Sequence, residues 1–292
     1  MTLKSLLYKA FVGGRWKVGY RDLHKDAPEE YRFADADLPK GQWVADPFLF
    51  ELNGKHYLFC EQYEEKLNRA GIGYFVFEDG IPKNKGLIIR QPYHMSYPCV
   101  FTHGDQVYMI PETSGNKTIE MYRAVEFPDK WELDAVLLSD AQYVDSTVYE
   151  TEGKKYLLSY VKEDGAWHLD IFALCMEERK LKKLHRKTYR TNIARPAGFL
   201  LETEQGMVRP AQDCSRKYGE SMILYRVLEA TEEGYREEAA QTICANQLKF
   251  PGKVHRVHTL NRDSIYEVVD VFQEKLDLLH GWKILKRSLL HR

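Results

Sequence analysis

Three similar stretches decide the fold: NGKHYLFCE (residues 53–61), GDQVYMIPE (104–112) and GKKYLLSY (153–160). Each one begins at a turn and continues as a run of aromatic and aliphatic residues, and they recur at about fifty-residue intervals. A repeat of that period predicts the blades of a β-propeller.

The repeat extends beyond the turns. Asp46 stands eleven residues before Tyr57, as Tyr97 does before Tyr108 and Asp145 before Tyr156. Four residues after those tyrosines come Glu61, Glu112 and Tyr160. Two weaker copies follow, GMVRPAQD with Arg209 and Asp213, and DSIYEVVD with Tyr266 and Asp270. The sequence therefore predicts five units.

The rest of the chain has strand chemistry. Short segments rich in β-branched and aromatic residues alternate with Gly, Asn, Asp and Pro turns, which predicts about four strands in each blade. Residues 16–21 (WKVGYR) have strand chemistry but no blade of their own. We expect them to complete the last blade and close the ring. Residues 1–272 are thus predicted to form one all-β, five-bladed propeller.

Composition allows this fold and excludes other classes. The chain has 292 residues, 44% of them hydrophobic and 13% aromatic, enough for one large core. A net charge of -1 argues against nucleic acid as a partner. Five cysteines without a CxxC pair indicate buried thiols in a reducing compartment. Lys4 and Lys9 interrupt the apolar run near the N-terminus, so we expect neither a signal peptide nor a spanning helix, and a cytoplasmic location.

Two segments depart from the propeller pattern. The charged stretch 177–187 predicts a solvated turn or outer strand edge. Residues 273–292 predict an amphipathic helix packed on the propeller or on a partner subunit, with contact to an anionic membrane surface as the alternative. Its apolar positions are Leu276, Leu279, Trp282, Ile284, Leu285 and Leu289, with Lys283, Lys286, Arg287 and Arg292 between them.

Hairpin geometry predicts a site. If Asp46 opens an inner strand, Asn53 and Gly54 reverse the chain and Glu61 closes the returning strand, both carboxylates lie at one rim. The same hairpin geometry in the other blades places four more pairs at this rim: Tyr97 with Glu112, Asp145 with Tyr160, Arg195 with Asp213, and His258 with Asp270. Inner strands surround a common axis, so we expect a funnel lined by these side chains.

The residue types in this funnel suit sugar chemistry. One carboxyl group of a pair protonates a glycosidic oxygen while another attacks or activates water. Aromatic faces stack on sugar rings, and Arg195 has a planar fork that binds carboxylate or phosphate. The alternative is that the same carboxylates only cap local backbone amides.

The histidines and the missing motifs narrow the chemistry further. His255 and His258 are three residues apart, so on a strand they face opposite sides and cannot chelate one ion together. We expect no metal or cofactor, with at most a single ion or water near His258 at the axis. The sequence contains no phosphate loop, dinucleotide fingerprint or Ser-His-Asp signature.

Several stretches resemble known propellers. VADPFLF (44–50) followed by GKHYLFCE (54–61) resembles the first blade of the five-bladed furanosidase superfamily of arabinanases, xylosidases, levansucrases and invertases. Five further stretches look like the N-terminal propeller domain of the glucosamine inositolphosphorylceramide transferase family: HMSYPCVF (94–101), YMIPETS (108–114), RPAG (195–198), RPAQDCSRKYG (209–219) and HTLN (258–261). The resemblance covers about residues 12–272.

This resemblance implies roles for particular residues. Asp46 stands where the superfamily has its nucleophile or general base, and Asp145 where it has the general acid. The Asp that usually opens the second blade is replaced by Ser-Tyr-Pro at 96–98, and Glu112 is placed to substitute for it. The predicted catalytic residues are Asp46, Asp145 and Glu112. The predicted substrate-binding residues are Glu61, His94, Tyr97, Tyr160, Arg195, Arg209, Asp213, His258 and Asp270.

Three functions follow as hypotheses. The first is a carbohydrate-active protein that makes or breaks a glycosidic bond in surface polysaccharide or glycolipid metabolism, acting on a carbohydrate or glycolipid, with a sugar nucleotide as a possible donor. The second is a non-catalytic glycan-binding propeller that positions substrate for a partner glycosyltransferase. The third is a protein-binding scaffold, which does not need a carboxylate-lined funnel.

Overall fold

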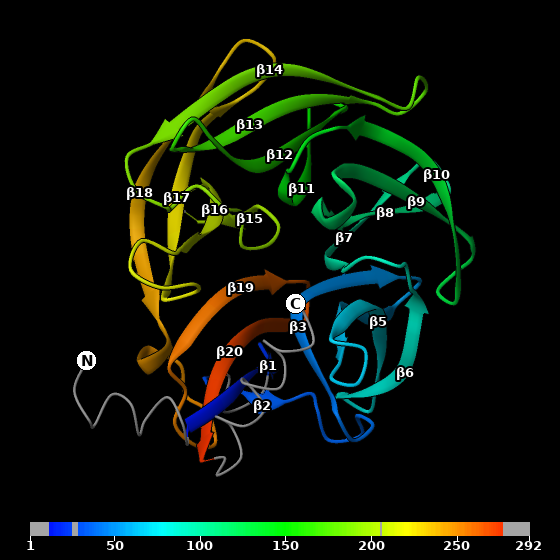
Figure 1. Cartoon of the computed structure of the whole chain (residues 1–292), viewed down its shortest axis with the longest axis vertical. Coiled ribbons are helices and arrows are strands. Elements are labelled where there is room, and N and C mark those ends of the chain that lie inside the picture. Colours follow the sequence, from blue (N-terminus) through cyan, green and yellow to red (C-terminus); the bar gives the residue numbers. More distant parts are fainter. Residues whose placement is uncertain (1–11, 25–28, 205, 277–292) are drawn as a thin grey trace, which may run out of the picture.

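The computed structural model describes residues 12–24, 29–204 and 206–276. It consists of five four-stranded antiparallel sheets arranged as blades around an axis, as Figure 1 shows. The predicted five-bladed β-propeller is therefore confirmed.

The first three blades follow chain order, from an inner strand near the axis to an outer strand at the periphery. Blade 1 contains β3 (Gln42–Leu52), β4 (Lys55–Glu64), β5 (Arg69–Glu78) and β6 (Ile81–Ile89). Blade 2 contains β7 (Ser96–His103), β8 (Gln106–Thr113), β9 (Thr118–Glu126) and β10 (Lys130–Ser139), with a 3-10 turn η1 (Ser114–Asn116) between β8 and β9. Blade 3 contains β11 (Val144–Thr151), β12 (Lys154–Glu163), β13 (Ala166–Cys175) and β14 (Lys180–Tyr189).

The last two blades are less regular. Blade 4 contains β15 (Leu201–Thr203), β16 (Gly206–Asp213), β17 (Ser221–Ala230) and β18 (Tyr235–Cys244), followed by the 3-10 turn η2 (Ala245–Gln247). Blade 5 contains β19 (Arg256–Arg262), β20 (Tyr266–Leu276), β1 (Val12–Asp22) and β2 (Arg32–Phe33), in that order across the sheet. Both ends of the described chain therefore lie in one sheet.

Blade 5 closes the ring. β1 pairs with β20 along its whole length, with Trp16 opposite Phe272 and Val18 opposite Asp270. This confirms that residues 16–21 complete the last blade. β20 continues to Leu276, so the predicted helix is wrong for residues 273–276, where pairing with β1 keeps the chain extended. The rest of that prediction lies outside the described residues.

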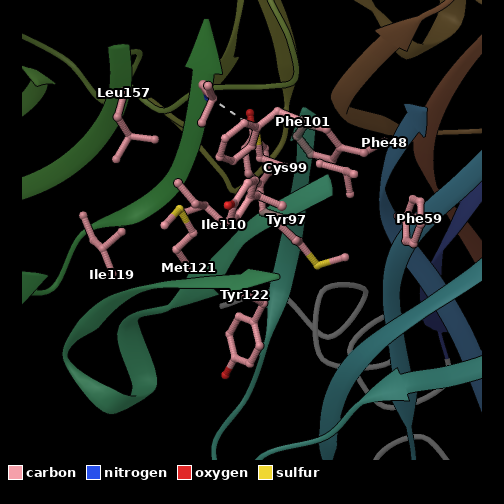
Figure 2. Close-up of a cluster of buried hydrophobic side chains, with 14 of the residues drawn as sticks. Phe48, Phe59, Tyr97, Cys99, Phe101, Ile110, Ile119, Met121, Tyr122 and Leu157 are labelled. Atoms are coloured by element: carbon pink, nitrogen blue, oxygen red, sulfur yellow. Dashed lines mark hydrogen bonds between the residues drawn. The ribbon is translucent and has the colours of Figure 1, made fainter. Parts of the chain in front are cut away.

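The core lies mainly between neighbouring blades. Figure 2 shows one cluster, to which blade 1 contributes Phe48 and Phe59, blade 2 contributes Tyr97 and Ile110, and blade 3 contributes Leu157. Each of these side chains is buried. Because each blade presents a flat apolar face to the next, the blades stabilise one another and fix the positions of the inner strands.

Three further expectations can be compared with the structure. The charged stretch 177–187 forms a turn and the outer strand β14, as expected. All five cysteines are free, but only Cys60 and Cys99 are buried and Cys244 is exposed, so buried thiols were predicted too broadly. Within the part of the chain that the structure describes, no helix is long and apolar enough to cross a bilayer.

Candidate functional site at the propeller axis

Three equivalent residues on the inner strands of blades 1 to 3 have a left-handed backbone conformation. The φ angles are 48° for Asp46, 48° for Tyr97 and 51° for Asp145. In each blade the pairing register with the next strand shifts at this residue, which marks a β-bulge. A β-bulge changes the direction of a side chain. A left-handed backbone conformation costs roughly 1 kcal/mol when the residue is not glycine. These bulges aim the three side chains at neighbouring blades.

Asp46 reaches from blade 1 to blade 5. Its Oδ1 accepts a hydrogen bond from Thr259 Oγ1 at 3.1 Å and lies 3.4 Å from His258 Nε2. Its backbone N–H donates to Asp270 Oδ2 at 2.9 Å. Asp270 Oδ1 in turn accepts from His258 Nδ1 at 2.6 Å and from the Thr259 N–H at 2.9 Å. Asp46, His258 and Asp270 thus form one buried network.

Burial governs the ionisation of this network. It raises the pKa of Asp46 well above its usual range, His258 lowers it, and the charges of Asp145, Glu61 and Asp270 raise it further. Burial lowers the pKa of His258, but Asp270 and Asp46 raise it by more, so the net shift is upward. Proton uptake by the imidazole is therefore favoured beside the two aspartates.

A second network joins blades 2, 3 and 4. The Arg195 guanidinium forms an ion pair with Asp145 through Nε, and its Nη2 lies 3.2 Å from Asp145 Oδ1 and 3.4 Å from Glu112 Oε2. Gln212 Nε2 donates to Asp145 Oδ2 at 2.7 Å and to the Pro196 carbonyl at 3.0 Å. Both oxygens of Asp145 are therefore bound by neighbours.

Glu112 is a second axial acid with a raised pKa. Burial raises its pKa to about 7, with a further increase from the charge of Asp145, while Arg195 and the Ser114 hydroxyl lower it. Its Oε1 accepts from Ser114 Oγ at 2.6 Å, and 12% of the side chain is exposed. A carboxyl group with this pKa exchanges a proton near neutral pH.

Glu61 and His94 complete the rim between blades 1 and 2. His94 Nε2 lies 3.3 Å from Glu61 Oε1, and His94 Nδ1 accepts from the Ala70 N–H at 3.3 Å. Burial lowers the pKa of His94, but the hydrogen bond and charge of Glu61 raise it overall. Beside this pair, Trp43 and Tyr63 stack with ring centroids 4.5 Å apart.

The arrangement of inner strands and axial residues points to a known family. Residues 32–269 match the family described as the N-terminal region of glucosamine inositolphosphorylceramide transferase 1. The chain belongs to that family.

Two plant relatives carry the same name. The glucosamine inositolphosphorylceramide transferase 1 of Oryza sativa subsp. japonica is 30% identical over 206 residues, which are 67% of this chain and 27% of the relative. The Arabidopsis thaliana protein is 27% identical over 216 residues, 70% of this chain and 28% of the relative. The chain thus spans little more than a quarter of the relatives it matches.

Solved structures share the fold. The catalytic domain of Coprinopsis cinerea GH62 α-L-arabinofuranosidase superposes with a TM-score of 0.57 at 12% identity, covering 81% of this chain and 93% of that domain. An exo-1,5-α-L-arabinanase from a bovine ruminal metagenomic library superposes with a TM-score of 0.51 at 15% identity, covering 80% and 92%. The resemblance to the arabinanase-type propellers is confirmed at the level of fold.

Eight of the predicted residues contact one another or influence one another's pKa at the axis: Asp46, Glu61, His94, Glu112, Asp145, Arg195, His258 and Asp270. The hydroxyl groups of Tyr97 and Tyr160 bind other protein groups. Tyr97 is fully buried, where its hydroxyl bonds with Thr147 at 2.8 Å and accepts from the Gly198 N–H at 2.6 Å. The Tyr160 hydroxyl donates to Asn192 at 3.2 Å.

Two predicted residues have local partners instead. Asp213 caps the turn that follows it, because its Oδ1 accepts from the N–H and hydroxyl of Ser215. Arg209 is fully buried inside blade 4, where it pairs with Glu237 at 2.7 Å. The Arg209 side chain also donates to the Tyr189 hydroxyl and the Ala194 carbonyl, so it lies among these groups and not at the predicted rim.

Some axial residues were missed. Gln212 and Thr259 bind the predicted aspartates directly. Trp16 stacks on His258 with ring centroids 3.9 Å apart, and Tyr218 lies over Arg195 at 5.3 Å. The sequence pointed to Gln212, Tyr218 and Thr259 only through their place within the stretches 209–219 and 258–261. Trp16 lies near the axis because its strand, β1, closes the ring.

Asp46, His258 and Asp270 are also close enough to share a metal ion, since their ligand atoms lie within 4.8 Å of one another. The hydrogen bonds above engage both oxygens of Asp270, Oδ1 of Asp46 and one nitrogen of His258, leaving Asp46 Oδ2 and His258 Nε2 as the freer ligands. Two ligands make an incomplete protein site for a tightly held ion such as zinc.

Proposed function

We propose that this chain is a carbohydrate-active protein that makes or breaks a glycosidic bond at the axial funnel, with Glu112 as proton donor. The observation that carries the proposal is the place of Glu112, a carboxyl group that is partly exposed at the axis and shares the Arg195 guanidinium with Asp145. Burial and the charge of Asp145 raise its pKa to about 7. An acid or base works best when its pKa is near the working pH. The relatives' name, which contains a sugar and a transfer reaction, supports a saccharide substrate.

The neighbouring residues have separate roles in this proposal. Asp145 uses both oxygens on Arg195 and Gln212, which leaves it to orient Glu112 and raise its pKa. Asp46 acts as base or nucleophile, held by Thr259 and His258. Burial raises the pKa of Asp46 as well as that of Glu112, and the neighbouring His258 opposes this shift by favouring the ionised form of Asp46.

The charge of the funnel limits the ligand. Five carboxyl groups, from Asp46, Glu61, Glu112, Asp145 and Asp270, face one arginine, Arg195, and two histidines, His94 and His258. Like charges repel strongly where water is excluded. The funnel therefore suits a neutral or cationic sugar, and the diphosphate of a sugar-nucleotide donor would have to remain outside it.

The proposal is tested with a panel of methyl and nitrophenyl glycosides, assayed for hydrolysis and for transfer to added saccharide. Asp46→Asn and Glu112→Gln are each expected to lower turnover about 100-fold or more while keeping the fold. Turnover should also decline as pH rises through about 7, because Glu112 must carry its proton. The matched control is Glu126→Gln, an exposed glutamate paired with Lys130. Unchanged turnover in both axial variants would refute the assignment.

A second candidate, a non-catalytic glycan-binding propeller serving a partner glycosyltransferase, is favoured by one observation. The position that opens blade 2 holds Tyr97, whose hydroxyl is buried among protein groups, and Asp145 is fully engaged. Saccharide binding by calorimetry with no turnover, unaffected by Glu112→Gln, would establish this candidate over the first. A role in surface polysaccharide or glycolipid metabolism, in a reducing cytoplasm, accompanies either proposal.

A further inference from the structure

One loop over the axis has no role in the chemistry described so far. Residues 214–220 connect β16 to β17 and lie against blade 5. The Gly219 carbonyl accepts from the Val257 N–H at 3.0 Å, and the Gly219 N–H donates to Cys214 Sγ at 3.3 Å. Arg256 Nη1 donates to the Tyr218 carbonyl at 3.3 Å. The loop is therefore held by bonds on both sides of Tyr218.

Gly219 is required by this placement. Its φ is +62°, and a Cβ there would lie 2.7 Å from Trp16 Cη2 and 3.1 Å from His258 Cβ. Any other residue would both strain the backbone and collide with the aromatic pair beneath. The loop backbone thus sits as close to the axial network as the chain allows, which fixes the direction of the neighbouring Tyr218.

Three neighbouring side chains contact the ring of Tyr218. It meets Trp16 edge-on with centroids 5.8 Å apart and His258 edge-on at 5.1 Å, and the Arg195 guanidinium lies 5.3 Å from its centroid. Despite these contacts 40% of the residue is exposed. An aromatic ring held rigidly with part of its surface open is the kind of group that stacks on a ligand at low entropic cost.

The hydroxyl of Tyr218 supports the same interpretation. Its phenol lies within electrostatic reach of Asp46, Asp145 and Glu61, carboxylates from blades 1 and 3. Burial and those charges raise its pKa, with Arg195 opposing, so the group keeps its proton and remains a donor. Among the described residues, no acceptor receives a hydrogen bond from this hydroxyl, whereas those of Tyr97 and Tyr160 are bonded.

We infer that Tyr218 is a substrate-binding residue of the funnel, whose open ring surface stacks on a sugar at the axis and whose hydroxyl donates a hydrogen bond to it. This inference rests on the proposed saccharide-binding function. Arg195 then orients Asp145 and Glu112 and also packs against the ring of Tyr218.

The experiment measures binding of the saccharide that the wild-type protein binds best in a panel of methyl furanosides and pyranosides that includes glucosamine. Tyr218→Phe removes only the hydroxyl and is expected to weaken binding about threefold to tenfold. Tyr218→Ala removes the ring as well and is expected to cost about tenfold or more. The matched control is Tyr149→Phe on β11. The Tyr149 hydroxyl makes a 3.5 Å contact with the Ala230 carbonyl.

A second variant, Gly219→Ala, tests the position of the Tyr218 ring. It keeps Tyr218 but displaces the loop from Trp16, so binding should weaken although the ring is present. Circular dichroism and the melting temperature report whether each variant is folded. Binding at wild-type strength by Tyr218→Phe and Tyr218→Ala would overturn the inference and leave the proposed function standing. Absence of saccharide binding by the wild-type protein would overturn the proposed function and this inference with it.

Discussion

Glu112, on β8 of blade 2, and Asp145, on β11 of blade 3, share one partner, the Arg195 guanidinium. Burial and the charge of Asp145 raise the pKa of Glu112 to about 7, so this carboxyl group keeps its proton up to neutral pH. Arg195 reaches both groups from blade 4 and offsets the charge that remains. Three blades thus combine to hold one proton near the axis, and several measurable consequences follow from that arrangement.

The first prediction concerns pH and stability. Glu112 has a folded-state pKa of about 7 against a usual value of 4.5, so on raising the pH the unfolded chain loses this proton first. Unfolding is therefore favoured increasingly between these two values, and the full penalty is present above pH 7. Glu112→Gln removes it and should raise the free energy of unfolding by about 2 kcal/mol at pH 8 relative to wild type, with little gain at pH 4.

Urea unfolding of both proteins at pH 4, 6 and 8 checks this prediction. Glu126→Gln, an exposed glutamate, is the control and should follow the wild-type pH dependence. A constant difference between Glu112→Gln and wild type at all three pH values would show that Glu112 does not titrate in this range.

The second prediction concerns Arg209. Neither Arg209 nor Glu237 has any exposed side-chain surface, and the ion pair lowers the pKa of Glu237 to about 2. Arg209→Met removes the buried cation and leaves Glu237 only its longer ion pair with Lys187, at 3.6 Å. The change should cost about 3–5 kcal/mol of stability. Arg226→Met breaks an exposed pair with Glu238 on the same blade and should cost less than about 1 kcal/mol. Equal losses in the two variants would contradict a structural role for Arg209.

The third prediction concerns ligand charge. Because carboxyl groups outnumber cations at the axis, an amino sugar should bind more tightly than its N-acetyl form at low ionic strength. The preference should shrink as salt is raised, since mobile ions screen the attraction. Calorimetry with glucosamine and N-acetylglucosamine at 20 mM and 500 mM NaCl, roughly a fivefold change in screening length, measures both. Tighter binding of the N-acetyl form at low salt would show that the funnel is not effectively anionic.

The fourth prediction concerns metal ions. Asp270 and His258 are engaged in hydrogen bonds with Asp46 and Thr259, so the axial network should be stable without a cation. We expect the melting temperature to be the same after dialysis against EDTA and after addition of 1 mM CaCl₂ or ZnCl₂, roughly a hundredfold or more above the Kd of a built site. A rise of several degrees with either ion would identify Asp46, His258 and Asp270 as ligands.

The local sequence pattern was sufficient to predict most of the fold. The turn at Asn53 and Gly54, where both φ angles are positive, and the alternation that follows it are properties of a single hairpin. Repetition of that hairpin at Tyr108 and Tyr156 predicted the blade number without any long-range information. The segment 273–276 was assigned wrongly because its helical spacing competes with pairing to β1, which lies at the other end of the chain.

The sequence by itself determined that the chain repeats a hairpin, that acidic residues recur at the start of the inner strands, and that their chemistry suits sugars. Only the tertiary structure decided which of these residues meet: Glu112 and Asp145 at Arg195, Asp46 with Asp270, and Arg209 with Glu237 away from the axis. It also brought Trp16 and Tyr218 to His258. Spacing along a strand specifies which face a side chain occupies, whereas its partners across the axis depend on how five blades close into a ring.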